Sequence, residues 1–298
     1  MQVQLSEEQI YTLLRGFSIP SQPQILADLQ MAQACGEPDL QEIGGLIRKD
    51  IYVSGSVLKV ANSPFYGMHK PVTSIEHALM LIGTQGVINI VNAVSLRQEF
   101  VLAKNLSDDD TSFLNRFWDS AEDTARAAAV ISRELALGQP DELYLLGLFN
   151  NAGIPLMLER FPDYRKVLSQ SYELIEGSIT NMENQHYETN HAVLGYYLTR
   201  SWKMPKQISE SIGQHHNLQT LFADASRHGS PLLNNVTIMK MAEHIVGLFA
   251  ILAANQTDRE WLELQTPILG YLNLSADDLA DLTQQCRELG IIDQVQAA

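Results

Sequence analysis

Residues 141–157 form a segment in which nearly every side of a helix is apolar, as expected for a helix surrounded by other helices. Two adjacent amides, Asn150 and Asn151, interrupt this segment. An asparagine side chain does not ionise near neutral pH, and its carbonyl oxygen is a weaker metal ligand than a carboxylate or an imidazole. The pair therefore marks a polar site or the remnant of one, and it argues against proton-transfer catalysis at this place.

Helix start and stop signals recur along the whole chain, whereas the alternation typical of strands is nearly absent. Three starts share a pattern in which serine, threonine or aspartate precedes glutamate or glutamine by three residues: Ser6, Asp39 and Thr73. Asp50 is expected to cap another helix, and Pro64 ends that helix because its ring restricts the preceding residue. Further helices are expected from about Asn190, from Pro205, over residues 236–252 and over residues 275–290, the last with Ser275 as its N-cap. The predicted fold class is all-α.

Composition and charge exclude several classes of protein. The 298 residues include 20 basic and 35 acidic side chains, which give a formal net charge of −15, and the basic residues are scattered. A groove that binds nucleic acid needs local positive charge, so we expect no nucleic-acid partner. Cys35 and Cys286 are far apart and belong to no CxxC motif, which argues against a disulfide or zinc framework.

Two further features concern location. No apolar stretch reaches the roughly 20 residues of a membrane span. The first residues also lack a basic start followed by an apolar core, the pattern of a secretory leader. We therefore expect no membrane association and a cytoplasmic protein.

Three stretches of the first half resemble the HDOD domain family: IPSQP at residues 19–23, DIYVSGSVLKVANSPFYG at 50–67 and SIEHALMLIG at 74–83. The similarity extends from about Leu13 to Asn217. Ile51 departs from the family, whose members usually carry proline after the aspartate. The resemblance implies a helical fold like that of the HD metal phosphohydrolases, usually without their metal-binding residues. It also implies a role in bacterial signalling or gene regulation, with protein partners.

Together with a break in composition at residues 108–110, this resemblance divides the chain into three parts. They are an N-terminal helical lobe over residues 1–110 with the HDOD similarity starting at about residue 13, a degenerate HD-like helical lobe over 111–218, and a C-terminal helical extension over 219–298. The acidic run at the first boundary is either a linker or the solvated start of a helix, where acidic side chains favour the helix dipole.

The resemblance also indicates where the metal ligands of an HD phosphohydrolase would lie. Such an enzyme has a first histidine near a helix start, a His-Asp pair on the next buried helix, further histidines downstream and a late aspartate. In this chain those positions hold Ser120, then Asn150 and Asn151, then His191, His215 and His216, and finally Glu243. A phosphohydrolase needs a cation held by several anionic or imidazole ligands. Because amides replace the central pair, we expect no catalytic residue and no cofactor.

The three remaining histidines leave alternatives open. His191, His215 and His216 can hold a single divalent ion with open positions, since three protein ligands suffice for zinc. They can instead be core histidines bonded to neighbouring carbonyl groups. In a third interpretation they line a remnant pocket with the other residues at the HD positions, and its buried amides are satisfied by imidazoles, by Ser120 or by trapped water.

The function predicted from these residues is a non-catalytic regulatory interaction module in signal transduction. Its acidic surface would select a basic or mixed protein partner. One alternative is a metal-dependent phosphohydrolase with a reduced ligand set. Another is a nucleotide or small-ligand sensor, which needs arginines such as Arg116, Arg126 or Arg200 in the remnant pocket.

The turn after the helix that begins at Asp50 is a candidate interaction loop. Asn62 suits the C-terminus of a helix, because its amide tolerates a left-handed backbone and bonds nearby carbonyls, so it predicts a structural corner. Alternatively, the loop presents Phe65 and Tyr66 to a partner. Trp118 and Trp202 lie beside apolar periodic positions and are predicted to be core residues.

Overall fold

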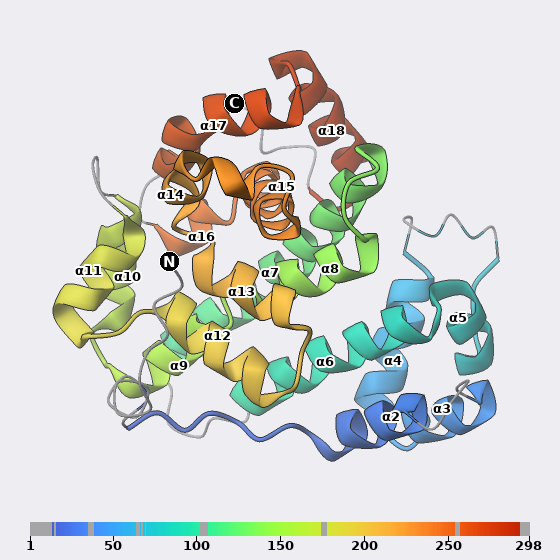
Figure 1. Ribbon diagram of the computed structural model, residues 1–298. Coiled ribbons are helices and arrows are strands. Elements are labelled where there is room, and N and C mark those ends of the chain that lie inside the picture. The colour runs from blue at the N-terminus through green and yellow to red at the C-terminus, as the bar shows by residue number, and fades with distance from the viewer. Residues whose placement is uncertain are drawn as a thin grey trace.

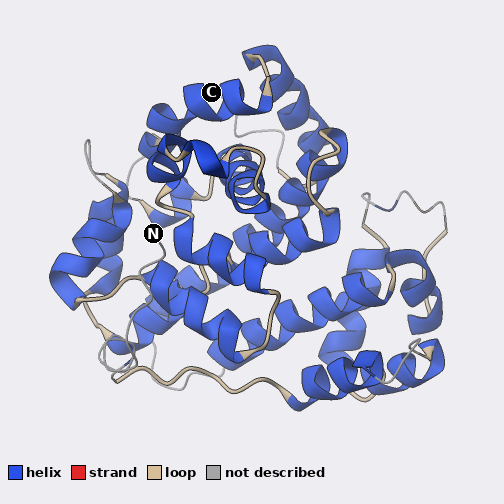
Figure 2. Ribbon diagram, in the orientation of Figure 1, coloured by secondary structure: helices blue, strands red, loops and turns tan. Residues whose placement is uncertain are grey.

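The computed structural model describes residues 14, 16–34, 39–63, 66, 68, 70–101, 107–173, 178–253 and 257–292 (Figure 1). Within these ranges every regular element is a helix and no strand occurs (Figure 2). The predicted all-α fold class is therefore confirmed. The predictions about Ser6, Pro64 and Phe65 concern residues outside these ranges.

The first group of helices is α2 (Gln24–Ala34), α3 (Leu40–Ile47), α4 (Ile51–Ala61), α5 (Ile75–Ile82) and α6 (Thr84–Val101). Asp39 and Asp50 cap α3 and α4 as predicted, and the Asp50 carboxylate accepts hydrogen bonds from two backbone amides at 2.9 and 3.1 Å. The start predicted at Thr73 is wrong by one residue, since Ser74 caps α5. The serine fits because a cap directly precedes the first helical residue, and Ile75 already packs into the core.

The second group is α7 (Asp108–Glu134), α8 (Pro140–Phe149), α9 (Gly153–Arg160), α10 (Tyr164–Tyr172), α11 (Ile179–Tyr187), α12 (His191–Ser201) and α13 (Lys206–Gln214). Ser107 caps α7, so the three aspartates that follow are the start of a helix and not a linker. α7 packs along α8 and α15 (Pro231–Val246). Its inward face is buried from Phe113 to Ser132, which makes α7 the central support of this group.

The apolar segment over residues 141–157 is not one continuous helix. α8 ends at Phe149 and α9 begins at Gly153, and the two asparagines lie in the turn between them. The absence of a side chain at Gly153 lets α9 approach α12, because a Cβ atom there would lie 1.9 Å from the carbonyl oxygen of His191. The turn therefore places the asparagines beside the start of α12.

The remaining helices are α14 (Leu218–Ala223), the short 3-10 helix η2 (Ala225–Arg227), α15, α16 (Phe249–Leu252), α17 (Arg259–Leu272) and α18 (Ala276–Glu288). α15 is seen almost end-on near the centre of Figure 1 and contacts α7, α8, α13 and α17. The helix predicted over residues 236–252 is interrupted at Gly247, which ends α15 in a left-handed conformation with φ +76°. Ser275 caps α18, as predicted.

Residues 17–23 form an extended segment that leads along the second group to α2 (Figure 1). The indole Nε1 of Trp202 donates a hydrogen bond to the carbonyl oxygen of Pro20 at 2.9 Å, and Gln22 donates to the carbonyl oxygen of Trp202 at 3.2 Å. Trp202 and Trp118 are both buried, in agreement with their predicted place in the core. The segment joins parts of the chain that are 182 positions apart in the sequence.

Among the described residues, no single helix combines the length and the apolar composition needed to cross a bilayer. α5 and α6 meet both criteria only as a pair, and that pair is bent by 112°.

Candidate metal centre and buried polar network

Three imidazole rings meet in the interior of the second group of helices. His191 is the first residue of α12, His215 is the C-cap residue of α13, and His216 follows it. The Nε2 atom of His191 lies 3.3 Å from Nε2 of His215 and 3.1 Å from Nε2 of His216. His191 and His215 are fully buried, and His216 is 9% exposed. The fold therefore brings the three candidate ligands into direct contact.

Each ring has a hydrogen-bond acceptor at its other nitrogen, Nδ1. The three acceptors are the carboxylate of Glu183 at 2.8 and 2.9 Å from His191, the carbonyl oxygen of Ile212 at 2.6 Å from His215, and the carboxylate of Glu260 at 2.7 Å from His216. Because a carbonyl or an ionised carboxylate can only accept, Nδ1 carries the proton of a neutral ring in this arrangement. The unprotonated Nε2 atoms then face one another.

The charge state of two rings follows from their surroundings. Burial lowers the pKa of His215 well below its ordinary value, and the neighbouring His216 and Lys240 act in the same direction. Burial also lowers the pKa of His216, and Lys240 again contributes. Both rings are therefore neutral near physiological pH.

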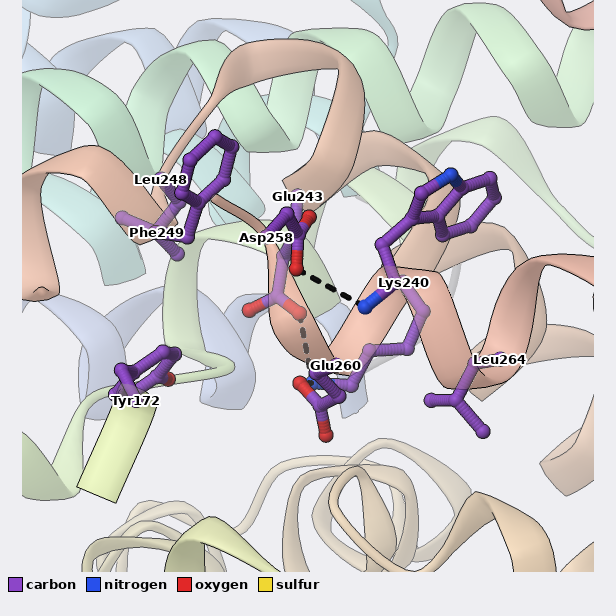
Figure 3. A pocket seen from close by; sticks show the side chains of 9 residues that line it. Tyr172, Lys240, Glu243, Leu248, Phe249, Asp258, Glu260 and Leu264 are labelled. Atoms are coloured by element: carbon purple, nitrogen blue, oxygen red, sulfur yellow. Dashed lines mark hydrogen bonds and ion pairs between the residues drawn. The ribbon is translucent and has the colours of Figure 1, made fainter. Parts of the chain in front are cut away.

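A second polar cluster lies beside the histidines and contains the two asparagines. The side-chain amides of Asn150 and Asn151 donate to Oε1 of Glu243 at 2.5 and 2.9 Å. Glu243 also pairs with the ammonium group of Lys240 at 2.9 Å (Figure 3). Lys240 pairs with Glu260 as well, at 2.8 Å. The expectation that imidazoles, Ser120 or water satisfy the amide groups is therefore wrong for their N–H donors, which are bonded to a carboxylate.

Within this cluster, Lys240 and the carboxylates of Glu243 and Glu260 stabilise one another's charged forms. Burial alone would lower the pKa of Lys240, but the carboxylates of Glu243 and Glu260 outweigh burial and raise it above its ordinary value. Burial raises the pKa of Glu243, and Lys240 opposes that change. Lys240 also lies 3.4 Å from Nδ1 of His216, so the two clusters are adjacent.

The structure places the candidate residues in two linked sets, and the side chain of Ser120 takes no part in the hydrogen bonds described above for either set. The Oγ atom of Ser120 and the Oδ1 atoms of Asn150 and Asn151 are buried without a hydrogen-bond partner among the described residues. An unpaired buried acceptor costs about 1–3 kcal/mol, so these oxygens are the atoms at which a polar ligand would gain most.

Sequence reasoning missed three members of this site, Glu183, Lys240 and Glu260. Lys240 could have been found, because it is a lone cation in a helix whose other residues are largely apolar. Glu183 and Glu260 lie 8 and 44 positions from the histidines that they contact, in helices with ordinary polar composition. No local signal distinguishes these two glutamates from other acidic residues.

The candidate interaction loop contains a well-bonded corner. The amide of Asn62 donates to the carbonyl oxygens of Leu58 and Val72, each at 2.8 Å, and its Oδ1 accepts from the amide of Val72 at 2.7 Å. Tyr66 is half-buried, and burial raises its pKa to about 12. The hydrogen bonds of Asn62 agree with a structural corner, but its backbone is not left-handed, with φ −92° and ψ 3°. Phe65 lies outside the described residues.

Of the three arginines named for a nucleotide sensor, Arg116 is exposed on α7, and the other two lie away from the histidines. Arg126 donates to the carbonyl oxygens of Leu289 and Gly290, at the end of α18. Arg200 lies near the C-terminus of α12, nine positions after His191, which is about 13 Å along a helix. The structure therefore offers no support for phosphate binding by these two side chains at the histidines.

The helical arrangement defines the class of protein to which the chain belongs, a multi-helix bundle with a buried polar centre. The model of the HDOD domain family matches residues 19–218, and the chain belongs to this family. Coverage of the match agrees with the similarity noted in the sequence.

Solved structures share this fold. An HDOD domain protein of unknown function from Geobacter sulfurreducens is 19% identical, with a TM-score of 0.60 over 95% of this chain and 99% of that chain. A protein from Shewanella amazonensis, provisionally named a phosphohydrolase, is 18% identical, with a TM-score of 0.65 over 91% and 92% of the two chains. At these identities the similarity concerns the fold alone.

A curated relative adds a comparison of length. An uncharacterized protein from Treponema pallidum is 26% identical over 226 residues, which cover 75% of this chain and 42% of that protein. The chain therefore spans less than half the length of this relative.

Proposed function

We propose that the chain is a regulatory signal-transduction module of the HDOD type, which acts through a protein partner and does not hydrolyse phosphoesters. The observation that carries this proposal is the bonding of Asn150 and Asn151. Both amides donate N–H hydrogen bonds to Glu243, and the ammonium group of Lys240 forms an ion pair with the same carboxylate.

This bonding removes the carboxylate from metal chemistry. A hydrolytic metal centre needs anionic ligands that are free to neutralise the ion and to position an activated water. Glu243 instead balances the positive charge of the Lys240 side chain, which is only 4% exposed. An amide N–H group carries partial positive charge and does not bind a cation. These contacts support the proposal that an internal ion-pair network stands where a phosphohydrolase has its reacting centre.

A surface near the first group of helices suits a partner. Ile51 and Tyr52 of α4 are 80% and 71% exposed, and Met80 of α5 is 69% exposed. Tyr52 and Trp118 line a groove of about 620 Å³ between the two groups of helices. The net charge of −15 favours a partner with a basic or mixed surface that inserts apolar side chains into the groove.

The name of one protein of the same fold agrees with this proposal. A protein from Marinobacter aquaeolei, provisionally named a signal transduction protein, has a TM-score of 0.60 over 95% of this chain and 65% of that chain, at 15% identity. Its name agrees with a regulatory role, and the role of this chain rests on the site described above.

The enzymatic part is tested with purified protein and chromogenic phosphomonoesters and phosphodiesters, each with magnesium, manganese, iron or zinc. We expect rates equal to those of buffer that contains the same metal. A metal-dependent turnover that disappears in His191→Ala would overturn the proposal.

The partner is sought by site-specific photo-crosslinking in the native host. A photoreactive residue at Tyr52 is compared with one at Leu262, a 57% exposed apolar residue of α17. We expect a defined crosslinked protein at position 52 and not at 262, and its capture should be lost when Ile51 is changed to aspartate. Equal capture at the two positions would contradict a partner surface on α4.

A further inference from the structure

We infer that His191, His215 and His216 bind one transition-metal ion of the zinc type, and that this ion stabilises the packing of α17 against the helices that carry the histidines. The inference does not depend on the regulatory role proposed above. It assigns the ion to the three imidazoles and leaves the asparagine network outside the ligand set.

The separations of the Nε2 atoms identify what fits between them. Zinc–nitrogen bonds of about 2.0–2.1 Å at tetrahedral angles place two ligand nitrogens about 3.3 Å apart. The observed separations are 3.1 and 3.3 Å, and the ligand atoms of all three residues lie within 4.8 Å of one another. A water molecule bonded to both nitrogens at about 2.8 Å would hold them about 4.6 Å apart. The spacing of the Nε2 atoms fits an ion or a direct N–H···N hydrogen bond between two rings, and it is too short for a bridging water.

The protonation pattern points to the same occupant. When each ring is neutral and its Nδ1 donates to the acceptor described above, the three Nε2 atoms present only lone pairs to one another. One added proton on any Nε2 would bond a single neighbour and leave the third ring unpaired. A cation at the centre accepts all three lone pairs at once. Three imidazoles without a carboxylate favour zinc, iron or copper over magnesium or calcium.

The acceptors at Nδ1 are arranged as the outer partners of metal-bound histidines usually are. Such partners fix the ring and its tautomer, and their loss weakens metal binding by about 10- to 100-fold. Glu183 is fully buried, and it accepts from the backbone amide of His191 at 3.2 Å and from the hydroxyl of Tyr164 at 2.5 Å. Its carboxylate is thus fixed by α10 and α12 before any ion binds.

Glu260 couples ion binding to the docking of α17. It comes from α17, which lies beyond the residues 19–218 matched by the HDOD model. Its carboxylate contacts His216 at 2.7 Å and Lys240 at 2.8 Å. Any factor by which Glu260 strengthens ion binding equals the factor by which the ion stabilises the docked position of Glu260, because the coupling is reciprocal. Ion binding therefore favours the docked state of α17.

The first test measures the ion itself. Untagged protein that comprises residues 1–298 is dialysed and analysed for zinc, iron, copper and manganese, and the apoprotein is titrated with zinc and with cobalt. We expect one equivalent per chain and a visible cobalt spectrum of tetrahedral type. His215→Ala should abolish both, whereas His186→Ala, which changes an exposed histidine of α11, should leave them unchanged. No stoichiometric ion, or an ion retained in His215→Ala, would overturn the inference.

The second test measures the coupling to α17 and remains decisive if a histidine variant does not fold. Glu260→Ala should lower zinc affinity by about 10- to 100-fold. In the wild-type protein, zinc should slow amide hydrogen exchange of residues 259–272 by a similar factor. Bound zinc without any change in the exchange of these residues would refute the stabilisation of α17. Phosphoesterase activity plays no part in either readout, so failure here is distinct from failure of the proposed function.

Discussion

Gly153→Ala provides a sharp test of the packing that forms the site. A Cβ atom at residue 153 would lie 1.9 Å from the carbonyl oxygen of His191 and 2.7 Å from its carbonyl carbon, whereas ordinary contacts begin near 3.4 Å. The obstructing atoms belong to the backbone, so no change of rotamer can relieve the clash. α9 and α12 must separate by about 1.5 Å, and overpacking of this kind costs about 3 kcal/mol.

The matched control is Gly55→Ala. Gly55 lies in α4, is exposed, and has no atom within 4 Å of a Cβ built on it. Alanine there should stabilise the protein by about 0.5–1 kcal/mol, because glycine loses more backbone entropy on helix formation. Urea denaturation followed by circular dichroism measures both free energies. The reasoning is refuted if Gly153→Ala unfolds within about 0.5 kcal/mol of the wild type while Gly55→Ala shows its gain.

Two further predictions concern buried ionisable groups. Lys240→Met leaves Glu243 without its buried counter-ion and should destabilise the protein by about 3–5 kcal/mol. The double variant Lys240→Met/Glu243→Gln should regain part of this loss, because it also removes the unpaired charge. Equal urea midpoints for the two variants would contradict the pairing. Burial raises the pKa of Cys286 to about 11, so only about one thiol in a thousand is ionised at pH 8. In a Cys35→Ser background, labelling of this thiol by an aromatic disulfide should therefore be slow until urea unfolds the chain. Rapid labelling of the native protein would show that this thiol is accessible.

The local features of the fold could be predicted from the sequence. Asp39, Asp50 and Ser275 were identified as caps because a capping side chain acts within its own first turn. The division between α8 and α9 was not predicted. An apolar run reports burial, but it does not show that Gly153 must bring α9 against the backbone of α12.

The candidate site was predictable only in part, for the same reason. The positions of His191, His215 and His216 followed from family resemblance, and the choice between an ion site and isolated core histidines stayed open. That choice depends on distances of 3.1 and 3.3 Å between atoms from separate elements. Glu260 could not be assigned at all, because its role is set by the docking of α17 and not by its neighbours in sequence.

The bond between Trp202 and Pro20 has a consequence for biosynthesis. The segment over residues 17–23 leaves the ribosome long before the tryptophan that receives it, since 182 positions separate the two bonded residues. At 5–20 residues per second, this interval lasts roughly 10–40 s. During that time the early segment lacks its docking partner and is open to proteases and chaperones. A nascent chain arrested before residue 202 should therefore be cleaved near residue 20 far more readily than one arrested after it.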